Sequence, residues 1–360
     1  MQKAKNKGQR AKGKELRAKN SMLVVLYILL IALCSMLYAV QGNAAQKGPK
    51  ETIALFPFEN FSEDRNALPM VMSLIRNKLE EKGFEVLDDD SLNKFLLKER
   101  IRSTGYISKD IAGKIGEELN VKAIMVGSVN SFTSGENPCV GFSARLVDSS
   151  DGAILWAKHV SATGEDFTTI LGLGRIKTVE KLTYKVMDKL LGSFSTIPPA
   201  KEKESTYRIA VMPFQNKSKM KDVGMIATYM FIDELFKNKK FVPLEYGDVR
   251  FLVVNLRIRD KGELDFEKTE AISRTLGVDG IIVGTVEVYK EGEGTAPPEA
   301  SISARLIDAH KNKILWSDYG QMKGDDDIFM LDWGRIYSAE SVSYKAIANL
   351  VKRMGKTKWR

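Results

Sequence analysis

Cysteine and histidine are scarce in this chain of 360 residues, which has two of each. Cys34 lies inside an apolar run and Cys139 lies far from it, so a disulfide framework and a Cys-rich zinc site are both excluded. We interpret His159 and His310 as surface or hairpin residues. No motif supplies a nucleophile, a base and an oxyanion or metal group together. The sequence therefore predicts no metal site, no cofactor and no enzyme activity.

An excess of positive charge is also missing from most of the chain. The net charge is +9, but residues 1–20 hold eight basic side chains and a single acidic one, Glu15, so they account for +7 and the remainder for +2. A nearly balanced body has no bulk electrostatic attraction for phosphate backbones. We therefore expect no nucleic-acid partner.

The basic start is followed by an apolar run. Met22 to Val40 holds nineteen residues without a charged side chain, and the small residues of Gly42 to Ala45 come next. This order is typical of an export signal, with residues 1–21 kept in the cytoplasm and the chain after residue 45 carried across the inner membrane. The sequence thus predicts a periplasm-facing body.

Three outcomes remain open for this run. Cleaved signals have an apolar region of about 7–15 residues, whereas a spanning helix needs about 20. We favour a signal anchor at 22–45, with residues 22–40 in the inner membrane, over a cleaved signal peptide and release into the periplasm. The third outcome is lipid modification of Cys34, although Leu33 stands where such signals have a small residue.

The rest of the chain repeats itself at a nearly constant offset, which indicates a duplicated folding unit. The ordered matches are Ile53–Asn60 with Ile209–Asn216, Val126–Val129 with Val283–Val286, Ser143–Asp148 with Ser303–Asp308, Ile154–Trp156 with Ile314–Trp316, and Gly174–Ile176 with Gly334–Ile336. We predict a first repeat domain at 51–192, a second at 206–353, and a solvated linker at 193–205 that contains Pro198, Pro199 and a charged stretch.

Each copy is predicted to be an α/β unit. A short apolar strand at 53–58 leads to a helix that Gly83 ends, then to a strand at 84–87, two helical stretches and a buried strand at 123–129. A hairpin turns at Asp151–Gly152, where the second copy has Asn312, and both residue types accept positive φ. A long helix closes the unit. The order β-α-β-α-α-β-β-β-α predicts a mixed sheet packed by helices.

The segments Ile53–Asn60, Val126–Val129 and the hairpin from Ala144 to Trp156 resemble the bacterial envelope superfamily of CsgG, LpoB and the TolB amino-terminal domain. The resemblance covers 51–192 and again 206–353. Its members include a secretion pore for curli, an activator of a peptidoglycan synthase and a component of the Tol–Pal system. It implies a non-catalytic extracytoplasmic domain that binds or organises envelope components.

The chain departs from the pore-forming member in two ways. The anchor cysteine is poorly placed, and Asn130 to Pro138, between the buried strand and the hairpin, spans only about nine residues. A hairpin that crosses a bilayer needs two strands of about 9–11 residues each. A CsgG-like secretion pore subunit is therefore an alternative, not our first interpretation.

Six polar residues are candidate sites for partner binding or structural pairing. We place Arg175 and Arg335 at the start of the last helix of each copy and expect each to have a carboxylate partner, such as Asp148 or Asp308, since a cation in a first helical turn opposes the helix dipole. The full set is Arg175, Glu180, Tyr184, Arg335, Glu340 and Tyr344.

Two glycines interrupt the buried strands. Gly127 and Gly284 could allow a close approach by a ligand or by another backbone, but we favour a β-bulge at each.

The sequence thus favours a membrane-tethered interaction or scaffold protein whose partners are envelope proteins of an outer-membrane, secretion or wall-synthesis complex. The alternatives are a periplasmic solute-binding or sensory module with its ligand between the copies, and the pore subunit. Association of the chain with copies of itself stays open in each case.

Overall fold

The computed structural model describes residues 51–169, 173–199, 207–258, 266–329 and 333–357. The predicted basic segment and apolar run at 1–45 lie outside these residues. Within the described ranges, none of the helices is both long enough and apolar enough to cross a membrane. Residues 51–360 belong to one compact unit.

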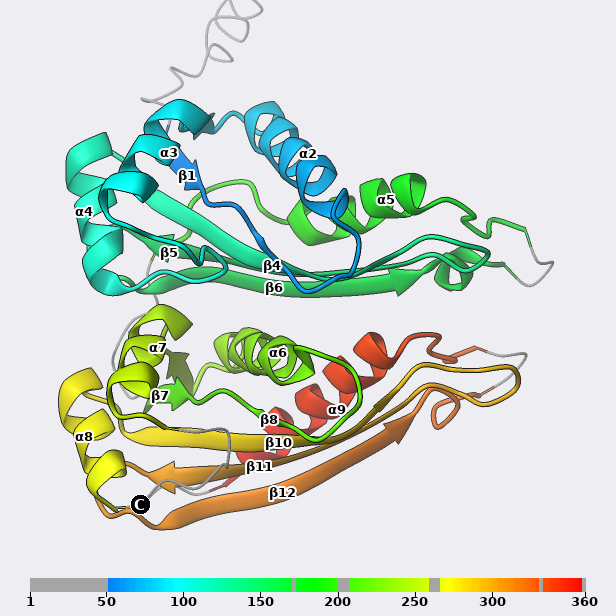
Figure 1. The fold of residues 1–360 in the computed structure, drawn as a ribbon. Helices are drawn as coiled ribbons and strands as arrows, with labels where there is room; N and C mark the ends of the chain where they lie inside the picture. The colour runs from blue at the N-terminus through cyan, green and yellow to red at the C-terminus, as the bar shows by residue number, and fades with distance from the viewer. Residues whose placement is uncertain (1–50, 170–172, 200–206, 259–265, 330–332, 358–360) are drawn as a thin grey trace, which may run out of the picture. The chain divides into compact units, whose positions relative to one another are not determined.

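The first repeat, drawn in blue to green in Figure 1, opens with a strand and closes with a helix. Its elements are β1 (Thr52–Leu55), β2 (Glu59–Asn60), α2 (Ala67–Glu81), β3 (Glu85–Val86), α3 (Asp89–Lys98), α4 (Lys109–Leu119), β4 (Ala123–Thr133), β5 (Cys139–Asp148), β6 (Ile154–Thr163), the 3₁₀ turn η1 (Gly164–Phe167) and α5 (Val179–Leu191).

The second repeat has the same order of elements in yellow-green to red. They are β7 (Tyr207–Val211), β8 (Gln215–Asn216), α6 (Val223–Lys237), β9 (Phe241–Pro243), α7 (Tyr246–Asn255), α8 (Phe266–Leu276), β10 (Gly280–Lys290), β11 (Glu299–Asp308), β12 (Ile314–Lys323) and α9 (Ala339–Met354). Apart from the short β2, β8 and η1, this is the predicted order.

The two sheets share one mixed topology. The strand order is β3-β1-β4-β5-β6 in sheet A and β9-β7-β10-β11-β12 in sheet B, with β2 and β8 paired to β4 and β10. The pairs β1–β3 and β1–β4 are parallel, while β4, β5 and β6 are antiparallel. The predicted loop at Asn130–Pro138 is too long, because β4 continues through Thr133 and pairs with Cys139.

Local sequence signals account for the ends of several elements. Gly83 follows α2 with a φ of 93°, a left-handed conformation that glycine adopts without steric cost. Gly152 and Asn312 occupy the same hairpin position with φ values of 73° and 50°. This confirms the predicted exchange of one residue type for another that also tolerates positive φ. Phe194, at the start of the predicted linker, is buried and stacks on Phe84.

The glycines in the buried strands allow close approach, and the prediction of a bulge at each was wrong. The register shifts lie downstream, between Val129 and Ser131 and between Val286 and Val288. A Cβ on Gly127 would lie 2.4 Å from the Ser143 carbonyl oxygen and 2.7 Å from the Phe58 ring. Gly284 faces the ring of Phe214 in the same way. The aromatic ring at the exit of the first strand therefore requires the glycine.

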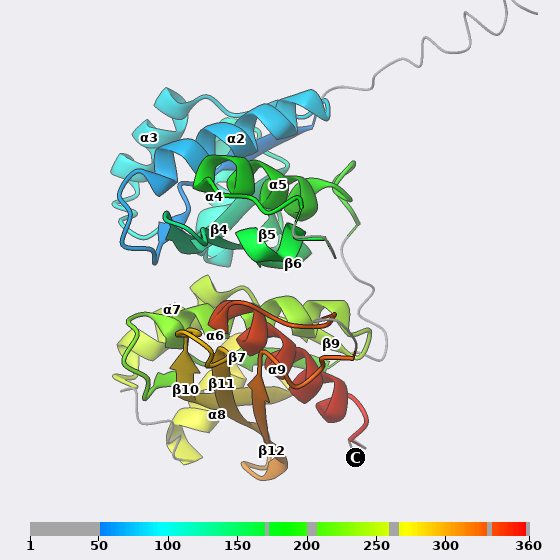
Figure 2. The same cartoon turned by 90° about the vertical axis from the view of Figure 1, so that its right-hand side faces the viewer.

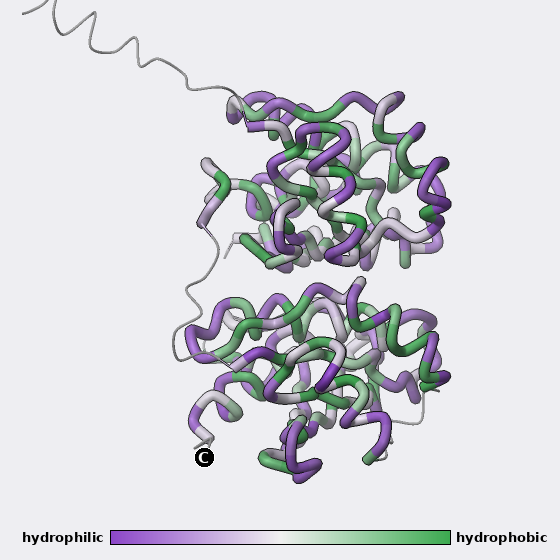
Figure 3. The backbone as a smooth tube through the Cα atoms, turned by 90° about the vertical axis from the view of Figure 1, so that its left-hand side faces the viewer, coloured by the Kyte–Doolittle hydropathy of each residue, from purple (hydrophilic) through white to green (hydrophobic). Residues whose placement is uncertain are grey.

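Sheet A is covered on two faces. In Figures 1 and 2, α2 and α5 lie together on one face of β4, β5 and β6. Helices α6 and α9 of the second repeat contact β6 from the other side, while α9 also packs on β11 and β12 of its own repeat. Hydrophobic and hydrophilic residues alternate along the helices of both repeats (Figure 3).

Helix α6 is therefore enclosed between two sheets. Eleven of its 15 residues are buried, compared with five of 15 in α2, its counterpart in the first repeat. A helix that contacts a sheet on one side buries a single stripe, whereas a helix between two layers buries most of its surface. The second repeat thus contributes a helix that serves the cores of both repeats.

We expect Gly127→Ala to destabilise the protein by about 1–3 kcal/mol, because the added methyl group overlaps the Ser143 carbonyl and the Phe58 ring. Gly113→Ala is the control: this glycine lies within α4, and a methyl group added there would meet no heavy atom within 4 Å, so its replacement should add up to about 1 kcal/mol. Urea denaturation measures both changes, and equal effects would contradict the packing argument.

Candidate functional site

The most unusual polar groups of the molecule lie in the seam, which we define as the contact of β4, β5 and β6 of the first repeat with α6, α7 and α9 of the second. Arg145 on β5 and Glu245, which precedes α7, form an ion pair there, with side-chain exposures of 0% and 1%. The Arg145 Nε atom lies 2.8 Å from Glu245 Oε2, and Nη2 lies 3.2 Å from Oε1. The geometry is bidentate, which is the strongest form of this pair.

Further contacts hold the Arg145 guanidinium in place. Its Nη2 atom donates to the Gly105 carbonyl oxygen at 2.9 Å, and the group lies over the Tyr229 ring, 4.4 Å from the centroid. Burial alone would lower the pKa of Arg145, but the Glu245 carboxylate raises it, and the net shift is upward. The side chain is therefore a permanent cation that needs its partner from the second repeat.

A second polar group surrounds Glu340 on α9. Its Oε1 atom accepts a hydrogen bond of 2.9 Å from Asn130 Nδ2, and its Oε2 atom accepts one from Ser131 Oγ. A Cβ on Gly141 would lie 2.1 Å from both carboxylate oxygens, so only glycine leaves room for this side chain. Burial raises the pKa of Glu340 to about 7.

His159 lies beside this carboxylate. Its ring packs against Tyr344 in a tilted arrangement with centroids 4.2 Å apart, and its Nδ1 atom lies 3.0 Å from Ser143 Oγ. Burial lowers the pKa of His159 to about 3, so the ring is neutral at physiological pH. His159 lies on the second strand of the β5–β6 hairpin, as predicted, but not at the surface, because strand β6 faces a covering layer on both sides.

Asp233 on α6 is a further buried carboxyl group of the seam. Neither of its carboxylate oxygens has a hydrogen-bond partner among the described residues. Burial raises its pKa to about 7, while Arg145 and Lys237 act in the opposite direction. The matching position of α2 holds Asn77, which is exposed. The carboxyl group is thus specific to the helix that lies between two sheets.

The residues singled out from the sequence fall into different environments in the two repeats. Glu340 and Tyr344 lie in the seam, whereas Glu180 is exposed and Tyr184 is 51% exposed. Arg175 lies before α5 and not in its first turn. Its partner is Glu165 at 2.8 Å, not Asp148, and it also donates to the Glu136 carbonyl oxygen. Arg335 is half-buried at the matching position.

Sequence reasoning missed the ion pair. Arg145 interrupts the alternating apolar residues of its strand, and the same Ala-Arg-Leu segment returns with Arg305. This pattern could have marked Arg145 as a residue on the face of sheet A that α2 and α5 do not cover. Nothing in the local sequence marks Glu245, which lies 100 residues further along and belongs to the other repeat.

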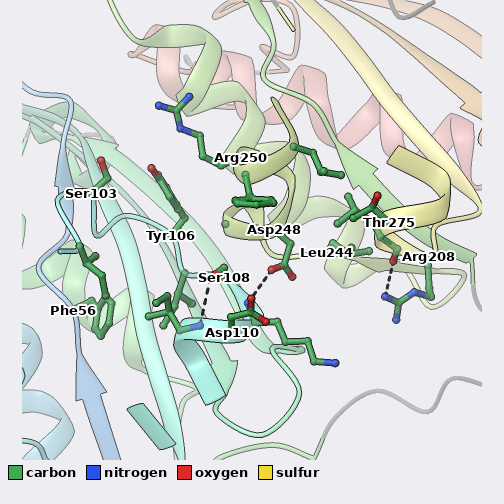
Figure 4. Close-up of a pocket in the computed structure, with 18 residues that line it drawn as sticks. Phe56, Ser103, Tyr106, Ser108, Asp110, Arg208, Leu244, Asp248, Arg250 and Thr275 are labelled. Carbon is green, nitrogen blue, oxygen red and sulfur yellow. Dashed lines mark hydrogen bonds between the residues drawn. The ribbon is translucent and has the colours of Figure 1, made fainter. Parts of the chain in front are cut away.

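A cavity of about 550 Å³ lies at one end of the seam (Figure 4). Side chains of both repeats line it, including Phe56, Tyr106 and Ser108 from the first and Asp248 and Arg250 from the second. Asp248 Oδ1 accepts a hydrogen bond of 2.8 Å from the Lys109 backbone N–H and so ties the two walls together. The lining combines aromatic, aliphatic and charged groups, as many small-molecule sites do.

A second cavity, of about 500 Å³, is lined by Asn130, Ser131 and Cys139 of the first repeat and Tyr289 and Glu291 of the second. Burial raises the pKa of the Cys139 thiol, so this group is protonated and a weak nucleophile. Within the described ranges, no three His, Cys, Asp or Glu side chains are grouped closely enough to hold a metal ion.

No family model matches the chain, and neither does a curated protein. Among solved structures, a PelC dodecamer from Paraburkholderia phytofirmans is 18% identical, with 41% of this chain and 87% of that chain covered and a TM-score of 0.29. Lipoprotein GNA1162 from Neisseria meningitidis is 21% identical, with coverages of 40% and 98% and a TM-score of 0.29. The LpoB C-terminal domain from Salmonella enterica is 15% identical, with coverages of 38% and 93% and a TM-score of 0.26.

We expect Arg145→Met to destabilise the protein by about 3–5 kcal/mol, because it leaves the Glu245 carboxylate buried without its counter-charge. The control is Arg305→Met at the matching, exposed position of β11, which should change stability by less than about 0.5 kcal/mol. Chemical denaturation measures both, and similar losses would show that the seam is not what distinguishes the two arginines.

The raised pKa of Glu340 predicts a pH-dependent stability. The folded state holds this proton up to about pH 7, whereas an unfolded glutamate releases it near the usual value of 4.5, so stability falls as pH rises between these values. Asp233 acts in the same direction, and neutral His159 acts oppositely as pH falls below 6.5. These two groups remain in a Glu340 variant, so comparison with the unmodified protein isolates Glu340.

Glu340→Gln should therefore gain stability relative to the unmodified protein between pH 5 and pH 8, by roughly 1–3 kcal/mol, since one pKa unit corresponds to about 1.4 kcal/mol. Glu180→Gln, at the exposed matching position, should show no such gain. Thermal unfolding across this pH range gives the comparison. A constant difference between Glu340→Gln and the unmodified protein would mean that Glu340 is ionised in the folded state.

Proposed function

We propose that this chain is a non-catalytic, extracytoplasmic interaction protein of the bacterial cell envelope. In this proposal residues 22–40 anchor it in the inner membrane, and its body supports the assembly of an outer-membrane, secretion or wall-synthesis complex. The basic segment and the apolar run at the start of the sequence support this address. Release after signal cleavage, and association with the outer membrane, are the alternatives for localisation.

The observation that carries the non-catalytic role is the position of the perturbed polar groups. In enzymes such groups face a cleft where a substrate can reach them. Here Arg145, Asp233 and Glu340 are at most 1% exposed and lie between two repeats. They join the repeats into one body, which leaves the outer surface for partners.

Part of that outer surface is apolar at matching places in the two repeats. Leu173, which follows η1, is 66% exposed, and its counterpart Trp333, after β12, is 59% exposed. Phe329 nearby is 85% exposed. Matching backbone hydrogen bonds run from Thr169 N to Leu173 O and from Phe329 N to Trp333 O. Exposed aromatic and aliphatic side chains that lie near one another are typical of protein contact sites.

The cavity of about 550 Å³ supports a second candidate, a solute-binding or sensory module with its ligand at the end of the seam. A ligand held by both repeats would stabilise their contact and raise the melting temperature. Asp248 and Arg250 would then be the groups that fix a polar ligand. A screen of envelope metabolites for melting shifts, repeated with Arg250→Ala, separates this function from the scaffold.

We expect a photo-crosslinking residue at Phe329 or Trp333 of the full chain to capture an envelope protein in intact cells, because these side chains project from the body. The matched control is Glu117 on α4, an exposed polar position remote from both loops in sequence. Mass spectrometry identifies the adducts. The same proteins captured from all three positions, or none from the loops, would exclude the loops as the contact site.

A further inference from the structure

We infer that copies of this chain associate head to tail, with sheet B of one copy packed on α2 and α5 of the next. The contact repeats the one that joins the two repeats within a chain. This inference does not depend on the proposed function, because self-association is compatible with any outside partner. It identifies two surfaces, the outer face of β11 and β12 and the outer face of α2 and α5.

The reason lies in the kind of contact that the seam makes. A sheet face of one repeat meets the helices of the other, so the two sides of the seam are different surfaces. Such a contact is heterologous, and each repeat carries both of its sides. Within the chain, sheet A uses its sheet side while α6 and α9 supply the helix side. One sheet side, on β11 and β12, and one helix side, on α2 and α5, are left over.

The ring pair of the seam has exposed counterparts on these surfaces. The ring of His159 on β6 packs against that of Tyr344 on α9 at a tilt of 41°. The repeat alignment places Tyr319 of β12 at the position of His159, and Tyr184 of α5 at the position of Tyr344. The two tyrosines are 50% and 51% exposed. Two aromatic rings are thus available for the same contact between copies.

The ion pair has counterparts of the same charge. Arg305 matches Arg145, is exposed, and makes no side-chain hydrogen bond or ion pair with the described residues. Asp88 matches Glu245: each is the residue before the helix that follows the short third strand of its repeat. Asp88 is exposed and begins an acidic triplet that continues to Asp90. A second copy would bring this acidic group to Arg305.

An aliphatic contact completes the set. Ile154 at the start of β6 is 5% exposed and packs with the buried core of the second repeat. Its counterpart Ile314, at the start of β12, is 58% exposed. Together with Tyr319, which is 50% exposed, Ile314 makes part of the exposed face of β12 apolar. A further copy of α2 would cover it as α6 covers Ile154.

The outer face of α2 is more polar than that of α6, so the contact between copies is weaker than the seam. Ser73 and Glu80 replace Tyr229 and Phe236. In addition, Glu180 would approach Glu287, the counterpart of Asn130. Lys217 pairs with Glu287 at 3.0 Å and offsets part of this repulsion. The expected association is therefore reversible and sensitive to substitution of single exposed residues.

Cysteine crosslinking of the full chain tests the inference. A chain with both Tyr184→Cys and Tyr319→Cys, treated with a short bismaleimide, should give a ladder of dimers, trimers and larger species. Each single variant alone should give no species beyond those of the unmodified chain, because a head-to-tail contact never joins two equal positions. Co-expression of the two single variants should stop at dimers.

Dimers from either single variant would overturn the inference in favour of a two-fold contact, and a double variant that stays monomeric would overturn it altogether. Arg305→Glu added to the double variant should reduce the ladder at least five-fold by repelling the acidic triplet. An unchanged ladder would refute the assignment of Arg305. The melting temperature of the Arg305→Glu variant should equal that of the double variant, which excludes misfolding as the cause of a reduced ladder.

Discussion

The buried ion pair of Arg145 and Glu245 is the constraint on which the rest of the structure depends. Each charge lies in a different repeat, and neither is tolerable in an apolar surrounding without the other. The two repeats therefore cannot separate without exposing or orphaning a charge. This is consistent with residues 51–360 forming a single compact unit although their sequence repeats itself at a nearly constant offset. The repeats behave as two layers of one folded body.

The burial of α6 and α9 in the seam accounts for differences between matching residues of the two repeats. Helix α6 lies against two sheets and has Tyr229 and Phe236 where α2, with one side in water, has Ser73 and Glu80. The carboxylate of α9 is buried at Glu340, whereas Glu180 of α5 is solvated. The same backbone position thus has different chemistry according to what covers it. The same residue type at matching positions of the two copies therefore need not have the same structural role.

The sequence predicted the features that depend on interactions between residues a few positions apart along the chain. The order of elements, the mixed sheet and the turns at Gly152 and Asn312 follow from periodicity and turn chemistry, which act over a few residues. The seam could not be predicted in this way. Arg145 alternates with apolar residues as any solvent-facing strand residue would, and only the arrival of α6 and α7 buries it. Alignment of the two repeats places Glu180 and Glu340 at equivalent positions, because a sequence contains no information about which layer packs on each residue.

Joining two layers through buried polar groups costs stability, and the composition of the seam indicates what this arrangement specifies. Asp233 has no hydrogen-bond partner among the described residues, and the Nη1 atom of Arg145 has none either, so the seam is not optimised for stability. The hydrophobic effect is not directional, so apolar contacts alone specify the register of two layers less sharply than hydrogen bonds do. A bidentate arginine pair is satisfied in one register only. The seam therefore fixes how sheet A meets α6 and α7, at some cost in stability.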